Sequence, residues 1–396
     1  MITVPGFLAS GVSSGIKENT KLDPKLDLGL IFSPKPAKAA AVFTKNVVKA
    51  APVLLGMERI KKGLCQAIVV NSGNANAGIG AQGMEHSRAV SKWVADSLGI
   101  DEGMVIPSST GKIGVPLPIE KIKNALAGLT AGLSEDGFER FARAIMTTDR
   151  FPKFVAGGME VGGKKGALCV VAKGAGMIAP DMATMLAYTL TDIDVEPSAL
   201  RKALKTAVDA TYNKIIVDGD TSTNDTAIML SSGALGNEPL REGDAEFAEF
   251  VRAVTELNYR TAHMIVKDGE GATKVAKIVV RGARTQDEAA RVAKTVGGSL
   301  LVKTALYGED PNWGRFLAAA GRAGVEFDPN KIDLRFNDLL VIENGAQALP
   351  ESAFEHVFKE AEFTVTLDLK SGGAESFVLT CDIGAEYVKL NSLYST

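Results

Sequence analysis

Apolar and polar positions recur along the chain with two spacings, which predict strands that alternate with helices. Short apolar runs that end in turn residues predict strands at residues 38–46, 65–78, 225–235 and 273–283. Apolar residues near helical spacing predict helices at residues 82–98, 195–214 and 246–269, and a helical stretch within residues 119–149. The pattern indicates an α/β (α+β) fold with mixed sheets packed with helices.

The last third of the chain repeats this alternation. The stretch "LDLKSGGAESFVL", residues 367–379, predicts a hairpin with Ser371, Gly372 and Gly373 at its tip. A polar segment around residue 285 follows a predicted strand and is the plainest boundary between domains. We therefore expect a core domain at residues 1–284 and a smaller C-terminal α/β domain at residues 285–396.

The composition is typical of a globular protein, and the charge favours small molecules as its partners. The chain has 396 residues, of which 46% are hydrophobic and 23% charged, so two domains are expected. A formal net charge of -3 does not favour nucleic acid or an anionic membrane as a partner. No apolar run reaches the roughly 18 residues of a membrane span. We expect a cytoplasmic protein, or one from an organelle matrix if a transit peptide has been removed.

The cysteines and histidines are few and scattered. Cys65, Cys169 and Cys381 lie far apart, and the first two stand in or beside apolar runs, which favours buried, reduced thiols. The three histidines are equally dispersed. Neither a His-based metal site nor a Ser-His-Asp triad is therefore favoured, although distant residues can converge in space.

Five loop stretches are richer in Gly, Asn, Thr and Asp than a bare connection requires. Such loops can present backbone N–H groups to an anion or oxyanion, although tight turns need the same residues. None of them matches a Walker loop or a dinucleotide fingerprint. The five stretches are "NSGNANAG", "SSTGKIG", "KGAGMIAPDMATM", "VDGDTSTNDT" and "KDGEGATK".

The fourth of these loops contains two carboxylates that are suited to a hard metal ion, Asp218 and Asp220. Their spacing does not fit the calcium-loop pattern, which also requires a distal Glu. The sequence therefore predicts no metal site.

A lone hydroxyl, Thr184, stands where the third loop gives way to an apolar run. A Thr hydroxyl needs a base to become a nucleophile, and its own α-amine, with a pKa of about 7.7–8.0, can serve once the preceding bond is cut. Attack of the hydroxyl on the carbonyl of Ala183 would form an ester, and hydrolysis of that ester would make Thr184 a new N-terminus. From the residues alone, a strand threonine is the alternative.

The stretch "KGAGMIAPDMATML" resembles the signature of the ornithine acetyltransferase family of arginine biosynthesis, also called the glutamate N-acetyltransferase family. Nine further stretches resemble blocks of this family in the same order along nearly the whole chain. They are "VPGFLASGVSSGIK", "AAAVFTKN", "NSGNANAG", "SSTGKIG", "MTTD", "VDGDTSTND", "KDGEGATK", "GEDPNWGR" and "NSLYST".

The resemblance implies an N-terminal-nucleophile-like core that cuts itself between Ala183 and Thr184. The products are an α chain, residues 1–183, and a β chain, residues 184–396, which assemble as an α2β2 heterotetramer. The resemblance also implies that an acetyl-Thr184 intermediate carries the acetyl group from N-acetyl-L-ornithine to L-glutamate. No coenzyme or metal is needed for this transfer, and acetyl-CoA is an additional donor in bifunctional members.

The resemblance also assigns roles to single residues. Thr184 is the nucleophile, and Thr110 and Gly111 supply the hydroxyl and the backbone N–H of an oxyanion hole. The remaining matched positions contact substrate; they are Thr147, Lys173, Glu270, Asn391 and Thr396. Among them Lys173 suits a substrate carboxylate and Glu270 suits a substrate ammonium group.

Two other readings of the sequence stay open. One is an amidase or aminopeptidase with related self-processing, in which water replaces glutamate as the acceptor. The other is a small-molecule binder that has lost its activity, which the intact Thr110, Gly111, Thr184 and Glu270 argue against.

Overall fold

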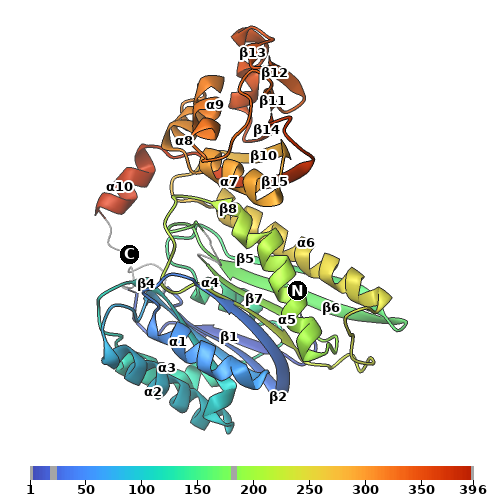
Figure 1. Ribbon diagram of the computed structural model, residues 1–396. Helices are drawn as coiled ribbons and strands as arrows, with labels where there is room; N and C mark the ends of the chain where they lie inside the picture. Colours follow the sequence, from blue (N-terminus) through green and yellow to red (C-terminus); the bar gives the residue numbers. More distant parts are fainter. Residues whose placement is uncertain (1–2, 18–24, 180–184, 394–396) are drawn as a thin grey trace.

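The computed structural model describes residues 3–17, 25–179 and 185–393, which form two mixed sheets with helices packed on them (Figure 1). The first sheet contains parallel and antiparallel pairs of strands, and β1 (Leu8–Val12) joins it by pairing with β2. The other strands follow in the order β4 (Val105–Lys112), β3 (Leu64–Asn74), β2 (Leu28–Phe43), β9 (Thr226–Ser231), β7 (Leu186–Thr191), β6 (Lys164–Lys173) and β5 (Lys153–Val161).

Helices cover both faces of the central strands of this sheet. Helices α5 (Pro197–Ala210) and α6 (Ala245–Lys267) pack on one face, and α4 (Phe138–Ala144) packs on the other. Within β6, Val170 belongs to the core under α5 and α6, whereas Val171 belongs to the core under α4. Successive side chains of a strand point to opposite faces, so strands between two helical layers read as continuous apolar runs.

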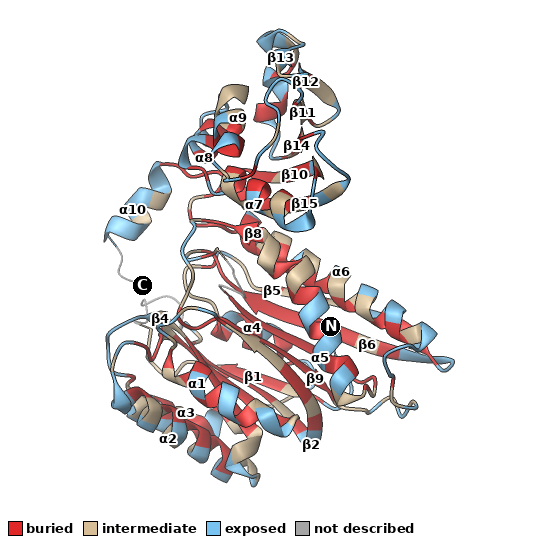
Figure 2. Ribbon diagram, viewed as in Figure 1, coloured by how far each residue is buried: buried red, intermediate tan, exposed pale blue. Residues whose placement is uncertain are grey.

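Three more helices lie at the β4 end of the first sheet. They are α1 (Ala51–Arg59), α2 (Ala81–Leu98) and α3 (Ile119–Ala131). The apolar faces of α2 and α3 form one core with residues of β2, β3 and β4. Figure 2 shows buried residues gathered where the helices meet the sheets.

The second sheet also mixes parallel and antiparallel pairs. Its strands follow in the order β13 (Ala346–Gln347), β12 (Leu339–Glu343), β11 (Asp333–Phe336), β14 (Glu362–Asp368), β10 (Val275–Ala283), β15 (Ala374–Cys381) and β8 (Ile215–Ile216). The helices that follow β10 are α7 (Gln286–Gly297), α8 (Leu300–Tyr307) and α9 (Trp313–Gly321). Thr285 caps α7, because its side chain accepts a hydrogen bond from the backbone N–H of Glu288.

The last helix, α10 (Ala385–Leu393), follows β15 and projects outward from the second sheet (Figure 1). None of residues 385–393 is buried. The helix therefore contributes little to either core, and its position becomes important only at the cavity described below.

The fold class that the sequence predicted, α/β with mixed sheets packed with helices, is confirmed. The predicted hairpin is wrong, because β14 and β15 are not neighbours: β10 lies between them, parallel to β14 and antiparallel to β15. The division of the chain at residue 285 stays a prediction, and β10, which precedes that point, pairs within the second sheet.

All three cysteines are buried and free, as the sequence predicted. Burial raises the pKa of Cys65 and Cys169 to about 12 and that of Cys381 to about 11, so the thiols are protonated and unreactive. Over the described ranges, no helix is long and apolar enough to cross a membrane.

Candidate active site

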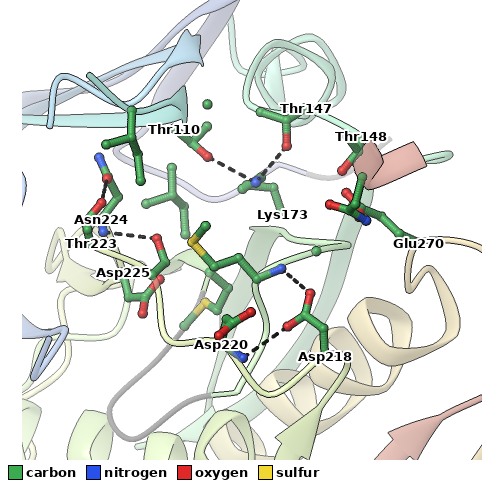
Figure 3. A pocket seen from close by; sticks show the side chains of 18 of the residues that line it. Thr110, Thr147, Thr148, Lys173, Asp218, Asp220, Thr223, Asn224, Asp225 and Glu270 are labelled. Atoms are coloured by element: carbon green, nitrogen blue, oxygen red, sulfur yellow. Dashed lines mark hydrogen bonds between the residues drawn. The ribbon is translucent and has the colours of Figure 1, made fainter. Parts of the chain in front are cut away.

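A cavity of about 130 Å³ lies where strand ends of the first sheet meet several loops and α10 (Figure 3). Strands β4, β6 and β7 contribute Thr110 and Gly111, Lys173, and Leu186 to its wall. The other lining residues come from loops and from α10; they are Ile113, Thr147, Thr148, Gly176, Met177, Met185, Asp218, Asp220, Ser222, Thr223, Asn224, Asp225, Glu270, Tyr387 and Asn391.

Strand pairing places the end of β6 beside the starts of β7 and β9. Lys173, the last residue of β6, pairs with Leu186 at the start of β7, and Leu186 pairs in turn with Thr226 at the start of β9. Just before β9, the side-chain amide of Asn224 donates to the carbonyl oxygens of Ala75 at 2.6 Å and Ser109 at 2.8 Å. The loop before β9 is thereby tied to the end of β4, which carries Thr110.

The end of β4 is built for close backbone approach. Gly111 has φ +129°, and a Cβ at this position would lie 2.4 Å from the backbone carbon of Gly73. A side chain at residue 111 would push the two strand ends apart, so the sequence needs glycine there. Thr110, the preceding residue, directs its hydroxyl to the cavity, where that oxygen accepts a hydrogen bond from Lys173 Nζ at 3.1 Å.

Lys173 is a buried cation in the cavity wall, with 7% of its surface exposed. Its Nζ donates to Thr110 Oγ1 at 3.1 Å and to Thr147 Oγ1 at 3.0 Å (Figure 3). Burial lowers the pKa of Lys173, and the charge of Asp149 opposes that effect. Because both threonine oxygens act as acceptors, their hydroxyl protons can point to other groups in the cavity.

Glu270 supplies a carboxylate on another side of the same cavity. It lies in the turn that follows α6, and its Oε2 accepts a hydrogen bond from Asn391 Nδ2 of α10 at 2.8 Å. Gly176 packs directly against this carboxylate, since a Cβ at residue 176 would lie 2.5 Å from Oε1. Glycine at this position therefore leaves room for the acid that faces the cavity.

The loop between β8 and β9 holds the segment before Thr184. The carboxylate of Asp218 accepts hydrogen bonds from the backbone N–H groups of Met177 at 2.5 Å and Ile178 at 2.8 Å. Met177 has φ +56°, a left-handed conformation that is uncommon for a residue with a side chain. Thr221 Oγ1 donates to the carbonyl oxygen of Ala179 at 2.9 Å. This chain segment is fixed up to the last residue that the structure describes before residue 180.

Asp218 and Asp220 line the cavity. From the sequence alone, these two residues stood out only as candidate metal ligands. Asp218 is engaged by backbone N–H groups, and burial raises the pKa of its carboxyl. Within the described part of the chain, no group of three or more His, Cys, Asp or Glu side chains could hold a metal ion.

The structure brings most of the residues assigned by resemblance into one cavity. Its lining includes Thr110, Gly111, Thr147, Lys173, Glu270 and Asn391. Ala183, Thr184 and Thr396 lie outside the described residues; Met185, which follows Thr184 in the sequence, lines the cavity.

Four of the five loops singled out in the sequence line this cavity, and the fifth is tied to it through the bond from Asn224 to Ala75. Their unusual content of Gly, Asn, Thr and Asp was the signal. Sequence reasoning missed Asn224 as a link between loops and Tyr387 as a lining residue. Burial and the nearby acids Asp218, Glu270 and Asp220 raise the pKa of Tyr387. No sequence signal marks Tyr387, which stands in an otherwise exposed helix.

Comparison with known proteins finds relatives that match along nearly the whole chain. The ArgJ family matches residues 8–396. The arginine biosynthesis bifunctional protein ArgJ of Geobacter sulfurreducens is 47% identical over 397 residues, which span 100% of both chains.

Solved structures are similar over part of the chain. A crystal structure of arginine biosynthesis bifunctional protein ArgJ from Bacillus halodurans is 36% identical with a TM-score of 0.52, over 53% of this chain and 100% of that one. An ornithine acetyltransferase from Mycobacterium tuberculosis, crystallised with ornithine, is 35% identical with a TM-score of 0.39, over 46% of this chain and 94% of that one. The chain therefore belongs to the ArgJ family, as its sequence blocks predicted, and is an acetyltransferase of arginine biosynthesis.

Proposed function

We propose that this enzyme transfers the acetyl group of N-acetyl-L-ornithine to L-glutamate through an acetyl-Thr184 intermediate. One observation carries the proposal: a single cavity gathers Thr110 and Gly111 at the end of β4, the buried cation of Lys173 and the carboxylate of Glu270, and Met185 also lines it. Hydroxyl and backbone N–H donors suit an oxyanion, and fixed opposite charges suit amino-acid substrates.

The transfer takes place in two half-reactions. In the first, the free α-amine of Thr184 accepts the hydroxyl proton as Oγ attacks the acetyl carbonyl carbon. The carbon–nitrogen bond then breaks, the departing nitrogen takes the proton, and L-ornithine leaves an acetyl ester on Thr184. In the second, the α-amine of glutamate attacks the ester, the proton returns to Oγ, and N-acetyl-L-glutamate leaves. All atoms come from the two substrates, so the scheme requires no coenzyme or metal.

The cavity supplies groups that suit both substrates. Lys173 is placed to pair with a substrate carboxylate, and the hydroxyl protons of Thr110 and Thr147 are available because both oxygens accept from Lys173. Glu270, with Asn391 bonded to it, is placed to pair with a substrate ammonium group. We assign Thr396 to substrate contact on the resemblance of the "NSLYST" block alone.

The same proposal includes self-cleavage between Ala183 and Thr184. The chain on both sides is held by neighbouring residues: Asp218 and Thr221 of the β8–β9 loop bind residues 177–179, and the backbone N–H of Thr226, the first residue of β9, donates to the carbonyl of Met185 at 3.0 Å. Such anchoring suits a bond that must be presented to the neighbouring hydroxyl. The whole of the solved Bacillus halodurans chain aligns with 53% of this chain. Cleavage at Thr184 would divide this chain into two pieces, each about half of its length.

The acceptor dependence of ornithine release tests the transfer. With N-acetylornithine as donor, we expect L-glutamate to raise the rate of ornithine release and to yield one N-acetylglutamate for each ornithine. An amidase would use water instead, so glutamate would leave the rate unchanged. Parallel assays of ornithine and N-acetylglutamate over a range of glutamate concentrations separate the two. Ornithine release that ignores glutamate contradicts the transferase mechanism.

Two further expectations from the resemblance stay predictions. Acetyl-CoA as a second acetyl donor is measured by formation of N-acetylglutamate from acetyl-CoA and glutamate, without N-acetylornithine. Assembly as an α2β2 heterotetramer is measured by light scattering of the purified enzyme.

The lowered pKa of Lys173 leads us to expect that substrate binding weakens at alkaline pH. Burial lowers the pKa of Lys173, while Asp149 and Glu270 raise it and Lys153 lowers it further. The ammonium group therefore loses its proton at a lower pH than an ordinary lysine, whose pKa is about 10.4. Since the free α-amine of Thr184 must be unprotonated to act as base, kcat/KM should rise through about pH 8 and fall again as Lys173 deprotonates.

Lys173→Arg tests this assignment, because the guanidinium group stays protonated across the whole range. The variant is expected to be slower, since its side chain is larger, but to lose the alkaline limb of the kcat/KM profile. An alkaline limb that stays at the same pH in Lys173→Arg assigns that titration to another group.

A further inference from the structure

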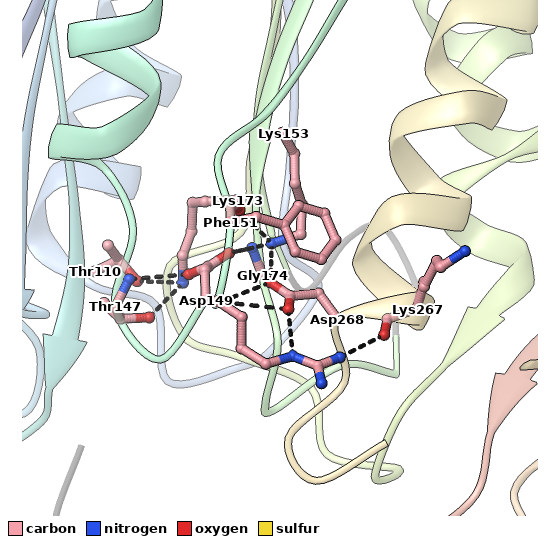
Figure 4. A network of polar contacts seen from close by, with 10 residues as sticks. Thr110, Thr147, Asp149, Phe151, Lys153, Lys173, Gly174, Lys267 and Asp268 are labelled. Carbon is pink, nitrogen blue, oxygen red and sulfur yellow. Dashed lines mark hydrogen bonds and ion pairs between the residues drawn. The ribbon is translucent and has the colours of Figure 1, made fainter. Parts of the chain in front are cut away.

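A buried carboxylate, Asp149, joins three segments of the chain beside the cavity (Figure 4). Its Oδ2 accepts a hydrogen bond from the backbone N–H of Thr147 at 2.9 Å. Its Oδ1 accepts from the backbone N–H of Gly174 at 2.7 Å and from Lys153 Nζ at 2.6 Å. One carboxylate thus connects the loop after α4, the end of β6 and the start of β5.

Lys153 extends this contact to a second buried acid. Its side chain is 0% exposed, and its Nζ also donates to Asp268 Oδ2 at 2.6 Å. Arg150 closes the far side, where Nε donates to Asp268 Oδ1 at 2.9 Å and the backbone N–H donates to Oδ2 at 3.0 Å. Asp149, Lys153 and Asp268 form a charged group that we call the buried triad.

Each acid of the buried triad is close in sequence to residues assigned to substrate contact. Asp149 binds the backbone of Thr147, two residues before it, and of Gly174, which directly follows Lys173. Asp268 stands two residues before Glu270 in the same turn after α6. None of the three members of the triad lines the cavity itself.

We propose that the buried triad is a positioning device that fixes Thr147, Lys173 and Glu270 relative to one another for substrate binding. The proposal rests on the substrate-contact roles proposed above for those three residues. It adds residues that act through others and touch no substrate themselves.

Two physical arguments support this role. A buried ion pair is weak evidence for stability, because apolar residues of similar volume often stabilise a protein as well, so retaining three buried charges beside the cavity needs another reason. Second, Asp149 compensates the charge of Lys173. Burial, the largest influence, raises the pKa of Asp149, but the charges of Lys153 and Lys173 and the hydrogen bonds from Lys153 and the backbone of Thr147 together lower it below its usual range, so the carboxylate stays charged and keeps accepting its three hydrogen bonds.

Asp149→Asn tests the proposal with little change in volume. An amide has one acceptor oxygen, so the variant loses part of the anchoring of Thr147 and Gly174 and all of the charge opposite Lys173. We expect KM for N-acetylornithine and for glutamate to rise by about tenfold to a hundredfold, with a smaller change in kcat. Rates are normalised to the fraction of cleaved chain, and ornithine binding is measured by calorimetry, which does not depend on turnover.

The matched control is Asp192→Asn, another buried carboxylate that accepts a backbone N–H, that of Ala167 at 2.7 Å, at the far end of β7. It should leave KM and ornithine affinity close to those of the wild type. If Asp149→Asn changes neither KM nor ornithine affinity, the positioning role is wrong. If the wild type itself shows no glutamate-dependent transfer, the proposed function fails instead, and the calorimetric comparison still decides the role of the buried triad.

The double variant Asp149→Asn with Lys153→Met separates positioning from stability. Lys153→Met alone leaves two buried acids without their shared cation and should lower Tm. Adding Asp149→Asn removes one of those charges and should recover part of the Tm. We expect KM to stay high in the double variant, because Thr147 and Gly174 remain poorly anchored. Recovery of KM together with Tm would show that the triad serves stability alone.

Discussion

Thr184→Ala is expected to leave the chain uncut and to abolish acetyl transfer. The variant lacks the hydroxyl that attacks both the carbonyl of Ala183 and the acetyl group. Removal of the nucleophile of a hydrolase costs on the order of 10⁶-fold in kcat, so activity should fall to background. Denaturing electrophoresis should show two chains for the wild type and one for the variant, and Edman sequencing of the larger wild-type chain should begin Thr-Met-Leu-Ala.

Two companion variants make this result specific. Thr184→Ser keeps a hydroxyl and should still cut itself and transfer acetyl, at a lower rate. Thr189→Val removes a buried hydroxyl from the middle of β7 and should behave as the wild type in cleavage. A full-length wild-type band, or cleavage of Thr184→Ala, would falsify self-processing by this residue.

The periodic elements of this fold could be predicted because their signals are local. The helix expected at residues 246–269 is α6, Ala245–Lys267, and the apolar run after Thr184 is the wholly buried strand β7, Leu186–Thr191. Local signals could not show that the two strands at residues 367–379 fail to pair with each other. A strand from far earlier in the chain, β10, lies between β14 and β15, and no local pattern at residues 371–373 indicates such an insertion.

The candidate site was predictable only in part, for a related reason. Unusual loop composition marked Thr110, Asp218 and Glu270, and the family resemblance marked Lys173, which would otherwise pass for a solvated loop lysine; it is only 7% exposed. The buried triad had no such mark, because Lys153 and Asp268 are 115 residues apart in sequence. Only the packing of β5 beside the turn after α6 shows that these charges are partners.

Thr110→Val is expected to lower kcat by about a hundredfold or more with a small change in KM. Lys173 Nζ donates to Thr110 Oγ1, so the hydroxyl proton is directed elsewhere, and the oxyanion of the tetrahedral intermediate is the acceptor that we assign to it. That acceptor carries its full charge only near the transition state, so the lost hydrogen bond reduces kcat more than ground-state binding.

Thr110→Ser is the matched variant, because it keeps the hydroxyl and loses one methyl group. Steady-state kinetics on the cleaved enzyme should therefore place Thr110→Ser near the wild type and Thr110→Val far below it in kcat. Lys173 keeps Thr147 Oγ1 as an acceptor at 3.0 Å in both variants, so a large rise in KM is not expected from a displaced lysine. If Thr110→Val raises KM and leaves kcat unchanged, Thr110 binds substrate in the ground state, and the oxyanion must be stabilised by Gly111 and other donors.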